Sequence, residues 1–214
     1  MSDGPRMYYD NDADLSLLDG KKIAIIGYGI QGRAQSLCLR DSGVDVIISE
    51  IKASPNYQIA LDDGWEIMDA GAAAKAADLI QILTQDHVQP VVYKTQVAEN
   101  LADGNALVFS HGFNIHFHQI LPPPTVDVFM IAPKGPGALV RQCYVEGIGV
   151  PALVAIEQNA TGKALDKALA YAKGIGATRA GLIETTFAEE TETDLFGEQV
   201  ALCGGLTKIG RAHV

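Results

Sequence analysis

Short runs of apolar, mostly β-branched residues alternate along the chain with longer amphipathic or alanine-rich stretches. The apolar runs predict strands at residues 22–26, 44–49, 79–83, 106–110, 126–132 and 152–157. The intervening stretches predict helices at 31–41, 70–77, 91–101, 137–146 and 161–175, with Gly43, Gly64, Gly104 and Gly176 at positions where helices end. Each strand is apolar along nearly its whole length, as is typical of a sheet covered on both faces. The pattern therefore predicts an α/β fold with a doubly wound, mostly parallel sheet.

The pattern changes near residue 182. Residues 184–194 are dense in carboxylates, and an apolar segment follows at 200–202. These features predict a helix that begins near Ala188 and opens an all-α domain. We therefore expect a first domain over residues 1–183 and the first helix of an incomplete helical domain over 184–206. The tail 207–214 resembles, from residue 209 on, the translation of a sequencing adapter, so we expect a truncated reading frame with a non-native end.

The charge balance and the cysteine content limit which partners and which cellular compartment we expect for this protein. Twenty-six acidic residues against sixteen basic ones give a formal net charge of −10. Nucleic acids and anionic membranes reward a basic surface, so this balance argues against both as partners. No apolar run approaches the roughly 18 residues of a membrane span, and no signal peptide is recognisable. Because Cys38, Cys143 and Cys203 are odd in number and lack CxxC spacing, we expect buried thiols in a cytoplasmic protein.

A glycine motif connects the first apolar strand to the following helix. Its sequence is Gly-Tyr-Gly-Ile-Gln-Gly, the GxGxxG pattern of dinucleotide sites. In this context the glycines provide a tight turn, close approach of a pyrophosphate, and close packing of helix on strand. The helix N-terminus adds N–H donors and a partial positive charge. The motif predicts a Rossmann-like site whose pyrophosphate turn is formed by Gly27, Tyr28, Gly29, Ile30, Gln31 and Gly32.

Residues that follow the second strand give conflicting signals about the adenosine ribose. Glu50 stands where a carboxylate accepts hydrogen bonds from the ribose 2′-hydroxyl, which favours NAD. The next loop offers Lys52 and Ser54, which are able to contact the 2′-phosphate of NADP. A solvated strand end is an equally open interpretation of Glu50.

Several long motifs resemble those of one enzyme family, the ketol-acid reductoisomerases (acetohydroxy-acid isomeroreductases), in their shorter, class I form. The resemblance runs in order from about Tyr8 to Leu206. Its motifs are the Tyr-Tyr-Asp segment at 8–10, Asp-Leu-Ser-Leu-Leu at 14–18, the glycine motif, Ser-His-Gly-Phe-Asn-Ile-His at 110–116, Ala-Pro-Lys-Gly-Pro-Gly at 132–137, Tyr-Val-Glu-Gly-Ile-Gly-Val-Pro-Ala at 144–152, and Glu-Thr-Thr-Phe-Ala-Glu-Glu-Thr-Glu-Thr-Asp-Leu-Phe-Gly-Glu-Gln at 184–199.

The resemblance implies a two-step reaction on a small 2-hydroxy-2-acyl acid such as 2-acetolactate. Mg²⁺ assists an alkyl shift, and NADPH, or in some members NADH, then reduces the product to a 2,3-dihydroxy acid. This chemistry belongs to branched-chain amino-acid biosynthesis. Members of the family are homo-oligomers, so the resemblance also implies such an assembly.

Candidate metal ligands lie in the acidic segment. Asp194 and Glu198 are four residues apart, so on a helix both carboxylates face one cation. Carboxylate oxygens suit Mg²⁺. By resemblance these two residues are metal ligands, and further glutamates come from later helices in the family. We expect Glu189, Glu190 and Glu192 to be surface charges or charges behind the ligands.

Two further residues are candidates for catalysis by resemblance. Lys134 follows the carboxyl end of a predicted strand, where open α/β sheets bind ligands, and its ammonium is expected to orient metal-bound water or a substrate oxygen. His111 ends another strand and is expected to shuttle protons. We interpret His116 and His118 as structural.

The resemblance also assigns cofactor contacts. Ser54 is expected at the adenosine phosphate, while Asp86, His87, Val88, Gln89 and Gly137 are expected on the nicotinamide side. Three positions depart from the family: Ile51 replaces an arginine, Asn56 replaces a serine, and Thr84-Gln85 replaces Pro-Asp. Because an arginine at position 51 would bind a 2′-phosphate and Glu50 would repel it, we expect a reduced preference for NADP(H) and use of NAD(H).

Two other functions fit parts of the sequence. A generic NAD(P)-dependent dehydrogenase of the β-hydroxyacid type would share the glycine motif and the sheet, and would not need magnesium. A non-catalytic dinucleotide-binding module would bind the cofactor without turnover.

Overall fold

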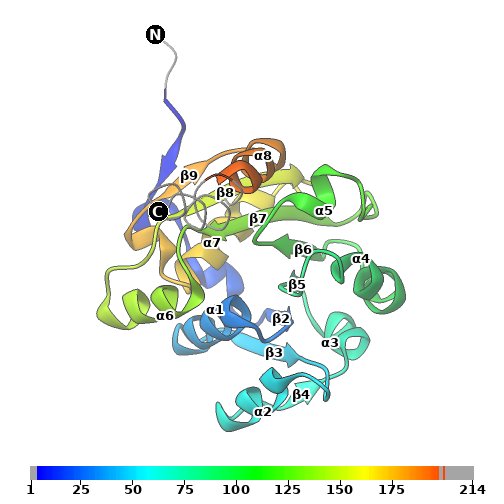
Figure 1. The fold of residues 1–214 in the computed structure, drawn as a ribbon. Coiled ribbons are helices and arrows are strands. Elements are labelled where there is room, and N and C mark those ends of the chain that lie inside the picture. The colour runs from blue at the N-terminus through cyan, green and yellow to red at the C-terminus, as the bar shows by residue number, and fades with distance from the viewer. Residues whose placement is uncertain (1–3, 198–199, 201–214) are drawn as a thin grey trace, which may run out of the picture.

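The computed structural model describes residues 4–197 and Val200. Its centre is one nine-stranded sheet in the order β1-β9-β8-β7-β6-β5-β2-β3-β4 (Figure 1). The strands are β1 (Met7–Tyr8), β2 (Lys22–Ile26), β3 (Asp45–Ser49), β4 (Ile67–Met68), β5 (Leu79–Ile82), β6 (Ala106–Phe109), β7 (Asp127–Pro133), β8 (Ala152–Gln158) and β9 (Leu182–Glu184). All six predicted strands are present, with ends that differ by at most one residue from the prediction.

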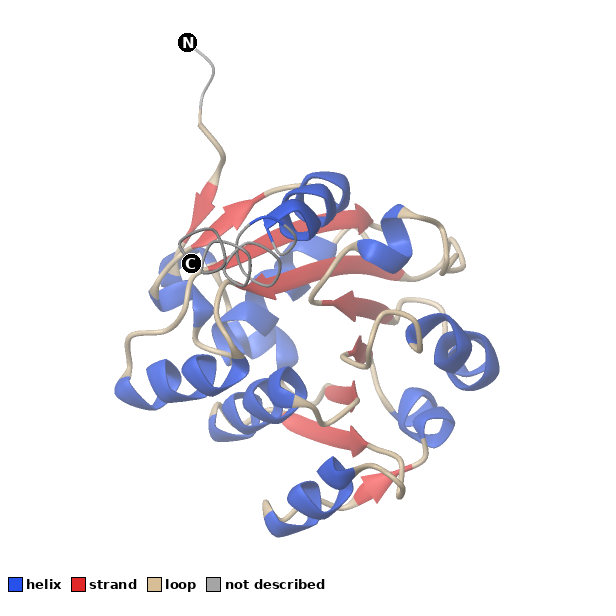
Figure 2. Ribbon diagram, viewed as in Figure 1, coloured by secondary structure: helices blue, strands red, loops and turns tan. Residues whose placement is uncertain are grey.

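Helices cover both faces of the sheet (Figure 2). They are α1 (Ile30–Asp41), α2 (Pro55–Asp62), α3 (Ala70–Ala76), α4 (Gln89–Val92), α5 (Phe113–His116), α6 (Gly137–Glu146), α7 (Ala164–Gly174) and α8 (Phe187–Gly197). One apolar cluster joins the sheet to α1 and α7, and a second joins it to α3, α5 and α8. This arrangement confirms the doubly wound α/β prediction. None of the helices in the described part of the chain is long and apolar enough to cross a bilayer.

The strand pairs are parallel except at two places. β8 runs antiparallel to β7. Its first residue, Ala152, lies opposite Pro133, the last residue of β7, so β8 begins at the end of the sheet where β7 stops. Helix α6, between these strands, packs against α1. At one edge of the sheet β1 pairs antiparallel with β9, and the Tyr8 hydroxyl donates to the Glu184 carboxylate over 2.7 Å. The N-terminal strand therefore supports the segment that leads into α8.

Local sequence explains where several helices begin and end. Asp69 caps α3 by accepting a hydrogen bond from the Gly71 N–H. Gly147 ends α6 with φ of +80°, a conformation that glycine adopts without strain. The predicted helix at 91–101 is instead α4 followed by a π-helical turn, Tyr93–Val97, and a 3₁₀ turn, Ala98–Asn100. The short elements β1, β4, β9, α2 and α5 were not predicted, because two to eight residues are too few for a clear periodicity.

A buried ion pair fixes α7 to the sheet and gives a pH-dependent prediction. Asp127, fully buried on β7, accepts hydrogen bonds from Lys167 over 2.7 Å and from the N–H and hydroxyl of Thr161. Burial alone raises the pKa of Asp127, but these hydrogen bonds outweigh it and hold the pKa below its ordinary value. The stabilisation is therefore complete above about pH 4 and is lost as the pH falls through the lowered pKa.

We expect Asp127→Asn to cost about 2 kcal/mol of unfolding free energy at pH 7, because Lys167 loses its charged partner. The loss should shrink as the pH falls through the acid range. Urea unfolding of both proteins between pH 3 and 7 measures it. If the unfolding free energies of the two proteins differed by the same amount at every pH in this range, the ionised Asp127–Lys167 pair would not be the source of the stabilisation.

Candidate active site

The glycine turn, residues 27–32, connects β2 to α1 in the conformation that a dinucleotide needs. Gly27 has φ of +101°, and a Cβ there would lie 2.9 Å from the backbone of Leu83 and Thr84. A Cβ on Gly32 would overlap the Gly27 carbonyl oxygen, whereas a Cβ on Gly29 would meet no atom within 4 Å. The first glycine thus makes the turn, the third allows close packing, and the second leaves open backbone at the start of α1. The tight turn at the first glycine and the close packing at the third match the prediction.

A cleft of about 380 Å³ lies beside this turn at the carboxyl ends of β2, β3 and β5. Gly27, Glu50, Ile51 and Val88 are among its lining residues. The Glu50 carboxylate accepts a hydrogen bond from the Tyr28 N–H and another from the Ile51 N–H, both over 2.8 Å. Glu50 is therefore attached to the glycine turn at the wall of the cleft.

Other predicted cofactor residues occupy several environments. The Ser54 hydroxyl caps α2 by accepting from the Asn56 N–H. Gln89 is buried, donating to the Thr84 carbonyl and accepting from Asn114, so its amide is used within the protein. His87 is exposed. Asp86 is partly buried, and this burial raises the pKa of its carboxyl.

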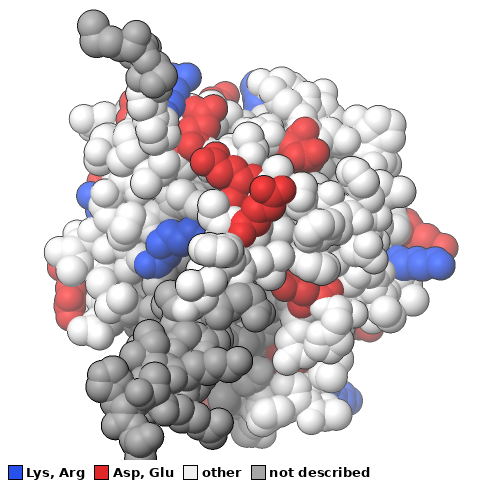
Figure 3. All heavy atoms as spheres, turned by 45° about the horizontal axis from the view of Figure 1, so that its top comes forward, with Lys and Arg blue, Asp and Glu red and all other residues white. Residues whose placement is uncertain are grey.

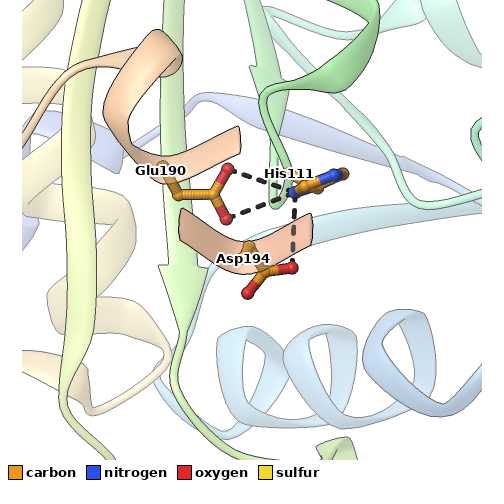
Figure 4. A group of neighbouring side chains, drawn as sticks. All are labelled: His111, Glu190 and Asp194. Carbon is orange, nitrogen blue, oxygen red and sulfur yellow. Dashed lines mark hydrogen bonds and ion pairs between the residues drawn. The ribbon is translucent and has the colours of Figure 1, made fainter. Parts of the chain in front are cut away.

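Four charged or titratable side chains meet where β6 and β7 end and α8 passes over them. We call His111, Lys134, Glu190 and Asp194 the polar centre. His111 Nδ1 lies 3.1 Å from Glu190 Oε2 and 3.6 Å from Asp194 Oδ2 (Figure 4). Lys134 Nζ lies 3.1 Å from Asp194 Oδ1 and 3.4 Å from Glu190 Oε1. The structure thus brings both predicted catalytic residues to one predicted metal ligand. The other predicted ligand, Glu198, lies outside the described residues.

Glu190 holds this centre together. Its side chain is 1% exposed, and its carboxylate also accepts from the Gly112 N–H over 2.9 Å. Burial raises the pKa of Glu190, but its bond to His111, the backbone bond and the Lys134 charge together hold that pKa below the ordinary value. For His111, burial lowers the pKa, and the Glu190 bond with the Glu190, Asp86 and Asp194 charges raises it above the ordinary value overall. The pair therefore favours a carboxylate beside an imidazolium.

The sequence left these glutamates open between surface charges and charges behind the ligands. Glu190 is the buried charge behind Asp194, whereas Glu189 and Glu192 are exposed. The sequence contained the signal: Glu190 and Asp194 are four residues apart and share a helix face, as Asp194 and Glu198 were expected to do. Helix α8 also packs on the loop after β6, since a Cβ on Gly112 would lie 2.8 Å from the Phe187 carbonyl oxygen. The two histidines that we interpreted as structural do not belong to the polar centre. His116 Nε2 lies 3.7 Å from Glu192, and His118 lies in a turn with φ of +54°.

The glycine turn and the polar centre are adjacent. Gln31 donates to the Gly135 carbonyl over 2.9 Å, and a Cβ on Gly137 would overlap the Ile30 carbonyl oxygen. The loop that carries Lys134 therefore rests directly on the turn. A doubly wound sheet with a glycine turn of this kind and a polar centre at the same edge is the arrangement of α/β proteins that bind dinucleotides.

Comparison with known proteins gives the family. Residues 17–181 match the sequence profile of the NADPH-binding domain of acetohydroxy acid isomeroreductase. The chain belongs to this family, the ketol-acid reductoisomerases.

Solved structures agree with this assignment. An NADH-preferring ketol-acid reductoisomerase from an uncultured archean is 48% identical, with a TM-score of 0.93 over 97% of this chain. The chain spans 64% of the length of that protein. A semialdehyde dehydrogenase NAD-binding protein from Cupriavidus necator is 20% identical, with a TM-score of 0.74 over 90% of this chain and 72% of its own. A 3-hydroxyisobutyrate dehydrogenase from Mycobacterium tuberculosis is 13% identical, with a TM-score of 0.59 over 85% of this chain and 60% of its own, so these two share the fold alone.

Proposed function

We propose that this chain provides the dinucleotide site and part of the catalytic centre of a ketol-acid reductoisomerase acting on 2-acetolactate or 2-aceto-2-hydroxybutanoate. The product is the 2,3-dihydroxy acid of valine and isoleucine biosynthesis. One observation supports this most strongly: the Lys134 loop contacts the glycine turn while its ammonium pairs with Asp194 and Glu190. The nicotinamide end of a dinucleotide bound at the glycine turn would therefore lie close to a substrate held at the polar centre. The proposal includes a cytoplasmic, homo-oligomeric enzyme.

The donor set of the polar centre fits Mg²⁺. One atom each of His111, Glu190 and Asp194 lie within 4.8 Å of one another, and two of these residues offer the carboxylate oxygens that Mg²⁺ prefers. The Glu190 carboxylate already accepts hydrogen bonds from the Gly112 N–H and from His111. We therefore assign the ion to Asp194, with Glu198 as the second expected ligand. When bound, the ion supplies polarisation of substrate oxygens and the dinucleotide supplies hydride.

The residues of the polar centre handle the protons of the reaction. With Glu190 ionised, His111 holds a proton on Nδ1, the nitrogen that faces the two carboxylates (Figure 4). The raised pKa keeps the ring protonated on both nitrogens nearer to neutral pH, so the imidazolium is suited to exchange its other proton, on Nε2, with the substrate hydroxyl and carbonyl. The Lys134 ammonium neutralises part of the local negative charge. Carboxylates also gather near the middle of the face drawn in Figure 3.

The activity is tested with protein expressed from the complete gene. We expect acetolactate-dependent oxidation of NADH that requires Mg²⁺. Dinucleotide binding without turnover in the presence of Mg²⁺ would favour a non-catalytic module. Turnover of a β-hydroxyacid without any metal would favour the generic dehydrogenase.

We further propose that NADH is the preferred cofactor. Glu50 is fixed at the cleft wall through the N–H groups of Tyr28 and Ile51, so its charge faces an incoming adenosine ribose. Such a carboxylate accepts from a 2′-hydroxyl and repels a 2′-phosphate. The side chain of Ile51 is exposed and offers no charge to a phosphate. The NADH preference of the 48% identical relative supports the same choice.

The Ile51→Arg variant is expected to bind NADPH about tenfold more tightly than the natural chain, because a guanidinium would pair with the 2′-phosphate. NADH affinity should change little. Fluorescence titrations with both cofactors measure the shift, and Ile51→Leu is the control without a new charge. A strong NADPH preference in the natural chain would refute the proposal.

A further inference from the structure

We propose that Gln35 is a positioning residue of the dinucleotide site, which orients the Lys134 and His111 loops from beneath the glycine turn. The inference rests on the proposed dinucleotide-binding function. Gln35 lies on α1, one helical turn after Gln31, and is fully buried between the sheet and α7. Burying an amide among apolar side chains is costly unless its hydrogen bonds are made.

The Gln35 amide has three partners from different parts of the chain. Its Nε2 donates to Gln31 Oε1 and to the Ser110 hydroxyl, each over 3.2 Å. Its Oε1 accepts from the Tyr171 hydroxyl over 2.7 Å. Tyr171 belongs to α7 and is itself fully buried, so it anchors the amide from the side opposite the turn.

The first of these contacts leads to the Lys134 loop. With its Oε1 held by Gln35, the Gln31 amide directs Nε2 outward, and Nε2 donates to the Gly135 carbonyl over 2.9 Å. Gly135 is the residue after Lys134. A hydrogen-bonded chain therefore runs from α7 through Gln35 and Gln31 to the loop that pairs with Asp194.

The second contact leads to the His111 loop. The Ser110 hydroxyl accepts from Gln35 and also from Gln81 over 3.0 Å. Gln81 is fully buried on β5, so two fixed amides hold the residue immediately before His111. Gln35 is the one side chain in this network that contacts both branches. A leucine would fill the same volume without the cost of burying an amide, so packing alone does not account for glutamine here.

The network supports one half of the cofactor site more than the other. Gln35 reaches the Gly135 loop through Gln31 and contacts Ser110 directly. Under the proposed function these two loops flank the nicotinamide. The adenosine cleft is formed by Glu50, Ile51 and Met68, none of which contacts the network. Loss of Gln35 is therefore expected to loosen the nicotinamide side and leave the adenosine side intact.

The test is the Gln35→Leu variant of the 214-residue chain, titrated with NADH and with AMP. We expect NADH binding to weaken about tenfold, as the loss of oriented hydrogen bonds predicts, with AMP binding changed less than about twofold. In a Gln31→Leu background, Gln35→Leu should weaken NADH binding further but by clearly less than tenfold, because only the Ser110 branch then remains to be lost. Equal weakening of NADH and AMP binding, or unchanged NADH binding, would overturn the inference.

Thr178→Val is the matched control for stability. Thr178 is also fully buried and donates a hydrogen bond to Asp10, far along the chain from the turn. We expect it to lower the melting temperature and leave NADH affinity unchanged. Failure of the natural chain to bind NADH would contradict the proposed function itself, whereas binding that is insensitive to Gln35 would contradict only the role of this residue.

Discussion

The Gly32→Ala variant is expected to lose about 3 kcal/mol of unfolding free energy together with most of its dinucleotide affinity. A Cβ at this position would overlap the Gly27 carbonyl oxygen, which is backbone and cannot rotate away. The helix must then move off the strand, and overpacking of this kind costs a few kcal/mol, about 1–3 in well-packed interiors. Because Gly27 lies against Leu83 and Thr84, the displacement would spread to β5. Urea unfolding and NADH titration measure the two losses.

Gly29→Ala provides the matched control, since a Cβ there meets no protein atom within 4 Å. Its unfolding free energy should stay within about 0.5 kcal/mol of the natural value. NADH affinity should still fall, because the pyrophosphate needs that open space. The two variants thus distinguish the effect of the glycines on packing from their effect on ligand binding. An unfolding free energy of Gly32→Ala equal to that of the natural chain would show that the turn is not tightly packed.

The Glu190→Gln variant is expected to reverse the direction of the pKa shift at His111. Burial by itself lowers the pKa of this imidazole, and the Glu190 partner with the nearby carboxylates raises it. Removing the main negative charge while keeping the side-chain size should leave burial dominant, so the pKa of His111 is expected to fall below its ordinary value. Reductoisomerase turnover by protein from the complete gene should fall about 100-fold, as is typical when proton transfer is impaired.

NMR titration of the histidine ring protons measures this change directly. Glu192→Gln is the control, because Glu192 lies on the same helix but faces His116 and is largely exposed. It should leave the His111 titration unaltered. An unchanged pKa of His111 in Glu190→Gln would mean that Asp86 and Asp194 alone sustain the imidazolium.

Strand positions and the glycine turn were predictable because both depend on short-range patterns. The runs at 22–26 and 137–146 match β2 and α6 residue for residue. Resemblance to the family named His111, Lys134 and Asp194 as site residues, and the structure places their side chains beside one another. Periodicity alone could not have done this, since their loops come from β6, β7 and α8.

Buried polar contacts were the part that the sequence did not reveal. The sequence left Glu190 open between a surface charge and a charge behind the ligands, and its burial follows from the packing of α8 on the loop at Gly112. Gln81 interrupts the apolar strand β5, and Gln35 is one of several polar residues on the amphipathic helix α1, so neither was distinguished by the pattern. Their roles depend on partners up to 136 positions away, such as Tyr171 for Gln35.

The pairing of β1 with β9 has a consequence for biosynthesis. Tyr8 and Glu184 are separated by 176 positions, so β1 leaves the ribosome long before its neighbour β9 does. At about 5–20 residues per second, Met7–Tyr8 waits on the order of 10 seconds of translation for β9. Contacts of such long range close late and slow the final stage of folding. The parallel strands from β2 to β7 are thus expected to assemble first, and the N-terminal segment to dock as the last step.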